Sequence, residues 1–517
     1  MQFTQGLHRA AQQQPDAIAT ACGPRQQTFR ELKDRVARLA GGLQGMGIKS
    51  GDRIAIYALN SDRYLEFYLA GAWLGAVVNP VNFRWSPAEV IYSLNDSQSS
   101  LLFMDDQFAP HADAVRQGAE CVKQFVFCGD GDLPDGMASH EQLIANSQPI
   151  ADCEAGDDTL FGVFYTGGTT GAPKGVMLSH RAVCTSALSL LADGAVPEGA
   201  VALHAAPMFH LADMMLITCL LLRGGQHVML PVFRPDTVLD LVQTHRISDL
   251  LLVPAMLQAV VDFPGLAQAD TSPIKRIMYG ASPASEALLD RTLKNIPTTQ
   301  LMQVYGMTET AAVIAVLPFA MHQPGQPREK LRSGGRAAFH TQVRIVDDNA
   351  VEKPQGDVGE IIVKTPALMQ GYLNKPEATA AAVKNGWMHT GDMGYMDADG
   401  YIYVVDRLKD MIISGGENVY SSEVENAIAK HPAVAASAVI GIPSDEWGEA
   451  VHAVVVLKPD TTLTHDDLYA HCKTLIAGYK CPRSMEVVNA LPVSGAGKVL
   501  KIELRKPHWE GKGRAVN

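Results

Sequence analysis

Short apolar runs alternate with stretches of helical periodicity from the beginning of this 517-residue chain to about residue 335. Residues 53–57 and 101–104 are typical of buried strands, and residues 64–74 between them are typical of a helix. The capping-box pattern of Thr28 and Glu31 indicates the beginning of another helix. Such alternation predicts an α/β fold in which helices cover mostly parallel sheets. The length indicates several domains.

The pattern changes after about residue 335, where short expected strands are separated by Gly, Pro and Asp turns. These strands predict a β-rich subdomain and lie at residues 343–346, 359–364 and 401–405. A helix and two strands that follow a charged segment predict a small, separate α+β domain; they lie at residues 422–431, 435–440 and 451–457. We therefore predict a large N-terminal domain, residues 1–406, and a small C-terminal domain, residues 411–517.

The bulk composition excludes several classes of protein. Hydrophobic residues make up 47% of the chain and charged residues 19%, the balance of a folded protein with a large core. The net charge of −12 argues against nucleic acid or an anionic membrane surface as a partner, because both select a basic face. The eight cysteines show no metal-binding spacing. With no signal core and no bilayer-length apolar run, we expect no integral membrane association and a cytoplasmic location; a homodimer is left open.

The segment 165–176 is rich in groups that bind phosphate. It contains four glycines, three threonines and Lys174, and it follows the apolar run 160–164. Glycine allows close approach of the backbone to an anion, and free N–H groups, hydroxyls and an ammonium can cradle a polyphosphate. The spacing differs from that of a Walker A loop. A Gly-rich loop alone usually has no binding function, but the threonines and the lysine favour binding of a nucleoside triphosphate.

Five further motifs follow in a fixed order, at residues 280–282, 305–309, 390–392, 406–410 running into 414–418, and 494–498. Together with the Gly-rich segment they closely resemble the adenylate-forming superfamily, which includes acyl- and aryl-CoA synthetases, luciferases and peptide-synthetase adenylation domains. The resemblance extends over essentially the whole chain. It implies that a carboxylate attacks the α-phosphate of ATP with Mg²⁺ present, and that the coenzyme A thiol then displaces AMP from the acyl-AMP.

The resemblance implies a nucleotide site made of several segments. The β- and γ-phosphates would be bound by Thr166, Gly167, Gly168, Thr169, Thr170 and Lys174. The nucleotide walls would be Gly280, Ala281, Ser282, Tyr305 and Gly306. Ribose and phosphate contacts would come from Asp392, Arg407 and Asn418. Gly167 stands where relatives often have serine, so one hydroxyl is lost while the backbone N–H remains.

The same resemblance implies four catalytic residues. Thr308 would contact the α-phosphate, and Glu309 would be the metal ligand, since a carboxylate suits Mg²⁺. Lys498, on a glycine-flanked loop, would meet the α-phosphate and the incoming carboxylate. His210 is either structural or a gate beside the acyl site, and its position in the motif favours the gate.

A movement of the small domain is also implied. The connection at residues 407–410 would be a hinge, with Lys409 the residue about which the domain rotates between half-reactions. After rotation, Gly415 and Gly416 would line the coenzyme A tunnel. Ile413 replaces a lysine that some aryl relatives place near the nucleotide.

The predicted acyl pocket is apolar, which indicates a hydrophobic monocarboxylic acid because an unpaired second carboxylate would be costly to desolvate. Its walls would be Phe209, His210, Ala212, Met215, Tyr279, Gly280, Val304 and Met307. Ala212 stands where several hydroxycinnamate ligases have a tyrosine, and Val304 replaces a glycine common in those ligases. A medium- or long-chain fatty acid and a simple aryl acid both remain open.

The leading hypothesis is an AMP-forming acid–CoA ligase. One alternative is an enzyme that loads the acyl group onto the phosphopantetheine of a carrier protein. A luciferase-like oxygenase is a weaker alternative, because the fold does not determine the second half-reaction. A non-catalytic nucleotide-binding relative should have lost Lys498, Glu309 or Asp392, and all three are present.

Overall fold

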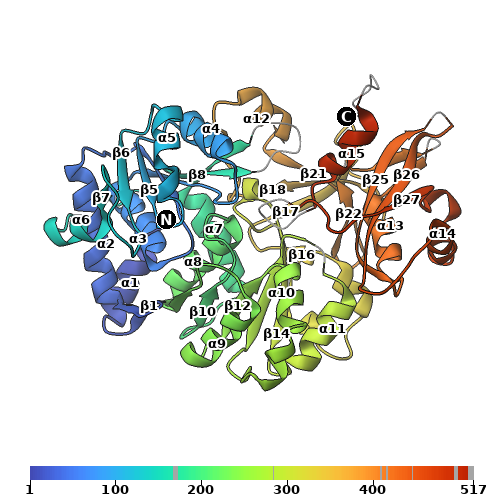
Figure 1. Ribbon diagram of the computed structural model, residues 1–517, viewed down its shortest axis with the longest axis horizontal. Coiled ribbons are helices and arrows are strands. Elements are labelled where there is room, and N and C mark those ends of the chain that lie inside the picture. The colour runs from blue at the N-terminus through green and yellow to red at the C-terminus, as the bar shows by residue number, and fades with distance from the viewer. Residues whose placement is uncertain are drawn as a thin grey trace. The chain divides into compact units, whose positions relative to one another are not determined.

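The computed structural model describes residues 1–166, 173–282, 284–407, 410–414, 417–444, 446–493 and 499–510, with only the backbone of Arg407. The described chain divides into two compact units (Figure 1). The first contains Met1–Gln342 and Val363–Met388, and the second contains Val343–Ile362 and His389–Asn517. The predicted β-rich strands thus group with the small domain in this division. The predicted domain boundary at 406–411 marks the point about which the small domain would rotate. It stays a prediction.

The first unit is built on two large sheets, which confirms the predicted α/β class. In one, the strands β1, β11, β10, β12, β13 and β14 run parallel, and antiparallel strands extend both edges. In sheet order the strands are β16 (Arg336–Ala337), β15 (Ala315–Leu317), β14 (Gln300–Tyr305), β13 (Arg276–Gly280), β12 (Asp249–Leu252), β10 (Val201–His204), β11 (Gln226–Met229), β1 (Ile18–Cys22) and β2 (Arg25–Thr28).

The other sheet has a parallel part and an antiparallel edge. The predicted strands at 53–57 and 101–104 are confirmed as β3 and β5, which are parallel neighbours. In sheet order the strands are β19 (Gly371–Tyr372), β9 (Lys174–Ser179), β8 (Leu160–Thr166), β4 (Val77–Pro80), β3 (Arg53–Tyr57), β5 (Leu101–Met104), β6 (Gln124–Phe127) and β7 (Ala138–Ser139). Strands β8 and β9 form a hairpin, and β19 pairs with the outer side of β9.

Helices pack against these sheets, as strand–helix alternation requires. Helix α8 packs on β10, β11 and β12, and it lies beside α7 (Figure 1). The helices of the first unit are α1 (Gln5–Gln13), α2 (Phe29–Gly45), α3 (Asp62–Leu74), α4 (Pro87–Ser97), α5 (Ala112–Gly118), α6 (His140–Asn146), α7 (His180–Ala192), α8 (Leu211–Arg223), α9 (Pro235–His245), α10 (Pro254–Val261), α11 (Glu286–Asn295) and α12 (Pro376–Ala382). Short 3₁₀ turns occur at η1 (Ala109–His111), η2 (Pro264–Gln268), η3 (Thr308–Thr310), η4 (Phe319–His322) and η5 (Arg328–Arg332).

Local capping explains where two helices begin. The predicted capping box is confirmed, because Thr28 accepts from the Glu31 N–H and the Glu31 carboxylate accepts from the Thr28 N–H. Helix α3 begins two residues before the predicted 64 because Ser61 is its N-cap, with a hydroxyl that accepts from the Tyr64 N–H. No helix among the described residues is long and apolar enough to cross a bilayer.

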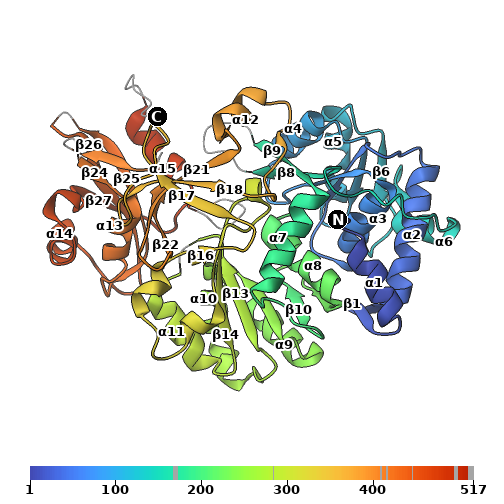
Figure 2. The ribbon, with the colours of Figure 1, turned by 180° about the vertical axis from the view of Figure 1, so that it is seen from behind.

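Most strands of two smaller sheets lie in the second unit (Figure 2), while the strand at residues 383–384 belongs to the first unit. One has the order β17-β18-β21-β20, with β22 paired to β21: β17 (Gln342–Val346), β18 (Gly359–Lys364), β21 (Trp387–Met396), β20 (Val383–Lys384) and β22 (Ile402–Arg407). The other has the order β24-β23-β26-β25, with β27 paired to β26: β24 (Glu417–Val419), β23 (Ile412–Ser414), β26 (Gly448–Leu457), β25 (Val434–Ser444) and β27 (Ser484–Val487). Its helices are α13 (Ser421–Ile428), α14 (His465–Lys473), the 3₁₀ turn η6 (Gly478–Lys480) and α15 (Lys501–Trp509). The predicted helix 422–431 ends earlier, at Ile428, because Pro432 disfavours helix before it.

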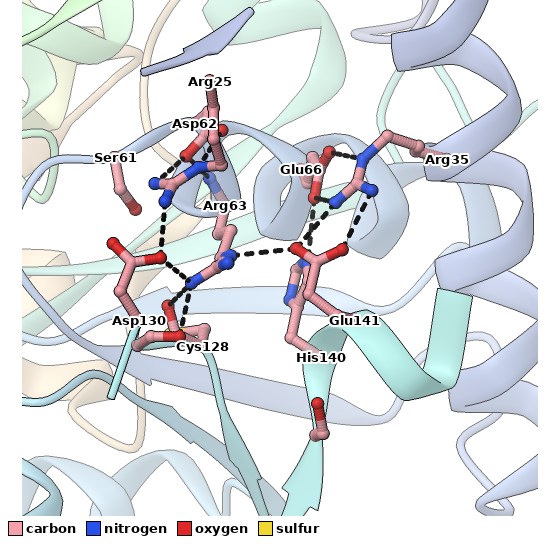
Figure 3. Close-up of polar contacts among 12 residues, drawn as sticks. Arg25, Arg35, Ser61, Asp62, Arg63, Glu66, Cys128, Asp130, His140 and Glu141 are labelled. Atoms are coloured by element: carbon pink, nitrogen blue, oxygen red, sulfur yellow. Dashed lines mark hydrogen bonds and ion pairs between the residues drawn. The ribbon is translucent and has the colours of Figure 1, made fainter. Parts of the chain in front are cut away.

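A partly buried ion network ties α2, α3 and α6 together (Figure 3). Glu66 is fully buried and accepts from Arg35 at 2.6 Å, from Gln27 at 2.9 Å and from His140 at 2.6 Å. Arg35 also donates to Glu141. Burial alone would raise the pKa of Glu66, but His140 and Arg35 outweigh burial and lower the pKa to about 2. The carboxylate is therefore ionised and satisfied within the core.

Replacing Glu66 by glutamine should lower the free energy of unfolding by about 1.5–3 kcal/mol, the range for hydrogen bonds to charged groups. Because the folded-state pKa of Glu66 is depressed, its stabilisation is complete above the usual value of 4.5 and is lost as pH falls towards about 2. Urea unfolding of both proteins between pH 7 and pH 3 measures this, with exposed Glu120→Gln as the control. An equal stability of the Glu66→Gln protein at pH 7 would contradict the prediction.

Candidate active site

The predicted phosphate loop begins and ends on a hairpin. Thr166 ends β8 and Lys174 begins β9, and the two are register partners. The Thr166 hydroxyl lies 3.5 Å from the Lys174 carbonyl oxygen. The predicted loop residues between them, Gly167, Gly168, Thr169 and Thr170, lie outside the described residues. The hairpin therefore holds the predicted hydroxyl and the predicted ammonium at one end of the sheet.

A tyrosine that sequence reasoning missed joins Lys174 to the predicted metal ligand. Strand β19 carries Tyr372, whose hydroxyl donates to Glu309 Oε1 at 2.8 Å. Lys174 Nζ lies 5.0 Å from the centre of the Tyr372 ring. Burial, and then the charge of Glu309, raise the pKa of Tyr372 well above its usual value, so the phenol keeps its proton and remains a donor. The arrangement places a cation and a carboxylate around one aromatic ring.

Glu309 fits the role of a ligand for a hard cation. Its side chain is only 7% exposed, and its backbone carbonyl accepts from the Met369 N–H at 2.8 Å. Among the described residues, Oε1 is hydrogen-bonded to Tyr372 and Oε2 is not hydrogen-bonded. One carboxylate oxygen is thus fixed in place while the other is available, and carboxylate oxygen is what Mg²⁺ prefers.

A strained turn positions Thr308 and Glu309. Strand β14 ends at Tyr305 and leads into η3, after which Ala311 and Ala312 have φ of 49° and 77°. Non-glycine residues in this region cost of order 1–3 kcal/mol each and concentrate at functional sites. The turn is held by the Ser186 hydroxyl, which donates to the Ala311 carbonyl at 2.6 Å. Gly306 is required in the turn, because a Cβ there would lie 1.9 Å from the Ala312 carbonyl oxygen.

The predicted adenine walls are brought to the same sheet edge. Strands β13 and β14 are parallel neighbours, with Gly280 opposite Val304, so the segments that follow them leave the sheet together. A Cβ at Gly280 would lie 2.2 Å from the Val304 carbonyl oxygen, which explains the glycine. Ala281 follows with φ of 66°, and Ser282 is half-buried. Tyr305 ends β14 beside this segment.

The predicted acyl residues gather at the beginning of α8 and the end of β14. His210 is the N-cap of α8, and its N–H donates to the Pro207 carbonyl at 3.0 Å. Phe209 is buried, with its ring 5.1 Å from that of His210 and 5.1 Å edge-on from that of Phe83. The other members in these two places are Ala212, Met215, Val304 and Met307. Tyr279 is fully buried, and its hydroxyl is bonded to His322 at 2.9 Å and to Gln303 at 3.3 Å.

Buried side chains that the sequence did not reveal anchor the segment before α8. The Asn60 amide donates to the carbonyls of His204 and Ala206 at 3.0 and 2.8 Å, and its oxygen accepts from the Met208 N–H at 2.8 Å. The Tyr68 hydroxyl donates to the Met208 carbonyl at 2.8 Å. Both side chains come from the β3–α3 region, so this segment is rigidly held to the neighbouring sheet.

A chain of three buried residues fixes the first turn of α8. Asp213 lies 2.9 Å from His204 Nδ1, and His204 Nε2 lies 3.0 Å from His227 Nδ1. All three side chains are fully buried. Burial and the neighbouring His204 lower the pKa of His227, so this imidazole is neutral. The chain joins α8 to β10 and β11 behind the predicted acyl residues.

The remaining predicted residues belong to the second unit. Asp392 on β21 is the register partner of Arg407 on β22, and it is buried. Its N–H donates to the Thr390 hydroxyl oxygen at 3.0 Å. Asn418 on β24 is exposed and pairs in register with Ile413. Lys409, Gly415, Gly416 and Lys498 lie outside the described residues.

Comparison with known proteins identifies the family. The family described as AMP-binding enzyme matches residues 7–373, and the family described as AMP-binding enzyme C-terminal domain matches residues 423–498. The chain is 39% identical over 500 residues to a feruloyl-CoA synthase of an Amycolatopsis species, covering 96% of this chain and 97% of the relative. It is 35% identical over 511 residues to the fatty acid–[acyl-carrier-protein] ligase ScoC of Streptomyces coeruleorubidus, covering 98% and 96%.

A solved structure agrees with these matches. The o-succinylbenzoate CoA synthetase MenE from Bacillus subtilis, in complex with the acyl-adenylate intermediate OSB-AMP, is 30% identical with a TM-score of 0.84. The match covers 96% of this chain and 97% of that chain. The resemblance inferred from the motifs is confirmed. The protein belongs to the AMP-binding enzymes of the adenylate-forming superfamily.

Proposed function

We propose that this protein is an AMP-forming acid–CoA ligase that acts in the cytoplasm. In the first half-reaction an oxygen of the substrate carboxylate attacks the α-phosphorus of ATP, and pyrophosphate leaves. In the second half-reaction the thiol of coenzyme A attacks the acyl carbon, its proton is lost, and AMP leaves. The observation that carries the proposal is the cluster of Lys174, Tyr372 and Glu309 next to the Gly-rich loop.

The side chains of this cluster have complementary tasks. Lys174 and Thr166 bind phosphate oxygens at the ends of the loop, and Tyr372 keeps one oxygen of Glu309 occupied, which leaves the other for a cation. Mg²⁺ bound there would neutralise charge on the phosphate oxygens. Thr308 binds the α-phosphate, and Lys498 stabilises the charge that develops when the carboxylate attacks. Asp392 and Arg407 contact the ribose or phosphate.

The proposed substrate is a hydrophobic monocarboxylic acid. The predicted acyl residues at the beginning of α8 and the end of β14 are apolar except for His210, which we propose is the gate. Ala212 leaves room where a tyrosine would offer a hydrogen bond to a phenol, and Val304 narrows the floor. A relative named for feruloyl-CoA synthesis and a relative named for fatty acid ligation support an aryl acid and a fatty acid respectively.

One relative supports a second candidate function. ScoC is named as a ligase of a fatty acid to acyl-carrier protein, and it matches this chain over almost its whole length. Such an enzyme shares the first half-reaction and differs only in the thiol acceptor. The second candidate is therefore transfer of the acyl group to carrier-protein phosphopantetheine.

A panel of fatty and aryl acids tests both candidates. Each acid is incubated with ATP, MgCl₂ and either free coenzyme A or a phosphopantetheinylated carrier protein, and AMP release and thioester formation are measured. We expect thioester formation with free coenzyme A for a hydrophobic acid. Pyrophosphate exchange without coenzyme A thioester, but with acylated carrier protein, would favour the second candidate. Absence of pyrophosphate exchange with every acid would contradict both.

Replacing Lys409 by proline tests the hinge. Proline fixes φ at this position, so the small domain should not rotate between half-reactions. We expect acyl-AMP formation at nearly the normal rate and a slower conversion of acyl-AMP to thioester, measured separately in single-turnover assays. Lys409→Ala, which keeps backbone freedom, is the matched control. An equal loss of both steps in the proline protein would contradict the hinge.

A further inference from the structure

A group of polar side chains lies on one face of the small sheet in the second unit. Val451, Ala453 and Val455 of β26 belong to the apolar core that includes α13 and α14. Because side chains alternate along a strand, His452 points to the opposite face. There its ring lies 5.0 Å from that of His508 on α15, between centroids. The polar group therefore lies where α15 meets the sheet.

The strand register brings a carboxylate to the same place. His452 of β26 pairs with Ser484 of the parallel strand β27, and Glu486 lies two residues further along β27 on the same face. One ligand atom from each of His452, Glu486 and His508 can be chosen so that all three lie within 4.8 Å of one another. Two imidazoles and one carboxylate from three separate elements thus converge.

The hydrogen bonds of His452 leave one nitrogen for a ligand. Its side chain is 5% exposed, Nδ1 is 2.7 Å from the Ser484 hydroxyl, and Nε2 is buried without a hydrogen bond among the described residues. An unpaired buried nitrogen costs free energy unless a partner takes it.

We propose that His452, Glu486 and His508 bind a divalent transition-metal ion, with Zn²⁺ as the best match. Imidazole nitrogen and carboxylate oxygen are both Zn²⁺ ligands, whereas Mg²⁺ and Ca²⁺ select oxygen alone. Ser484 acts as the outer partner that fixes the tautomer and orientation of His452, as is usual for metal-binding histidines. Glu486 is exposed and His508 is half-buried, so the ion can enter from solvent, and its fourth position is open to water.

The site would fasten the end of α15 to the sheet. The beginning of this helix is held by Lys501, which lies 2.7 Å from Glu425, and its middle by Arg505, which lies 2.8 Å from Asp410. Its end is held by Trp509, whose Nε1–H donates to the Gly441 carbonyl of β25 at 3.1 Å. His508 is next to Trp509, so a bound ion adds a further attachment there. A ligand that binds only the folded state raises its stability. The proposal concerns the small domain alone and does not rest on the proposed function.

The full-length protein, stripped of metal with a chelator and dialysed, is titrated with ZnCl₂ by isothermal calorimetry. We expect one ion per chain at this site and an increase in Tm with Zn²⁺. His508→Ala and Glu486→Gln should each weaken Zn²⁺ binding at least about tenfold, since loss of even an outer partner costs 10–100-fold. Both residues are on the surface side of the site, so the variants should keep the native circular dichroism spectrum.

His471→Gln is the matched control. His471 is in the same domain and its ring packs against His431, but its Nε2 is already bonded to the Ala427 carbonyl at 3.0 Å. This variant should bind Zn²⁺ as the unaltered protein does. The proposal is overturned if the protein binds no Zn²⁺, or if both site variants bind it as tightly as the control. If His508→Ala fails to fold, the Zn²⁺ affinity of Glu486→Gln alone tests the proposal.

Discussion

The Lys498→Ala protein should form acyl-AMP about 10²–10³-fold more slowly, the effect of removing one electrostatic group aimed at developing charge. A compact ammonium on a flexible stem can follow the α-phosphate and the attacking carboxylate together, and no neighbouring residue of the glycine-rich segment 494–498 offers a second charge. The first half-reaction is measured by ATP–pyrophosphate exchange with the preferred acid from the panel. Thioester formation from chemically prepared acyl-AMP should be unchanged.

Lys506→Ala is the control for this experiment. Lys506 is an exposed lysine on α15, close in the sequence to Lys498, and it belongs to the solvated face of the helix. Its removal should change neither half-reaction. An adenylation rate in Lys498→Ala equal to that of the control would remove Lys498 from the mechanism, while a loss in both half-reactions would indicate damage to the domain.

Glu309→Gln should lower the adenylation rate by at least about 10²-fold and shift the Mg²⁺ titration to higher concentration. Glutamine keeps the size of the side chain and an oxygen that can accept from Tyr372, so the turn should survive. What is lost is the negative charge of the only carboxylate that the motifs assign to the metal. Pyrophosphate exchange at increasing MgCl₂ concentration separates weaker metal binding from a slower step.

Two further variants serve as comparisons for the Glu309→Gln protein. Tyr372→Phe removes the 2.8 Å hydrogen bond but keeps the carboxylate, so its effect should be smaller, about tenfold. Glu329→Gln changes an exposed carboxylate of the same unit and should have no effect. A Glu309→Gln protein with an unaltered Mg²⁺ dependence would contradict the assignment, whatever its rate.

Local patterns in the sequence were sufficient to predict many of the strands and helices of the fold. The strand predicted at 53–57 coincides with β3, because a short apolar run bounded by turn residues has no competing structure. The strand predicted at 451–457 is the end of β26, whose beginning at Gly448 follows from pairing with Ser444 across the hairpin. The local sequence does not show which strands pair with each other. The ends of strands that depend on such pairing were therefore not predicted.

The motifs located the candidate site but not the contacts that hold it. Tyr372 lies 63 residues after Glu309 and reaches it only because the two-residue strand β19 pairs with β9. A lone Gly-Tyr pair has no periodic pattern, so no local signal distinguishes Tyr372 from other tyrosines. The sequence also did not predict that His452, Glu486 and His508 converge. Metal-ligand spacing motifs consist of residues that are close along the chain, and these three residues are not.

The first unit contains residues 363–388 in addition to residues 1–342. This limits where the chain can be cut to make fragments or chimeras. A fragment that stops at Gln342 would retain Glu309 and the hairpin but lose Tyr372, and with it the strand that covers the outer side of β9. Its bare β9 would be an open template for intermolecular pairing. Recombination between related ligases should therefore exchange 1–342 and 363–388 as one block, and chimeras cut between these segments should aggregate.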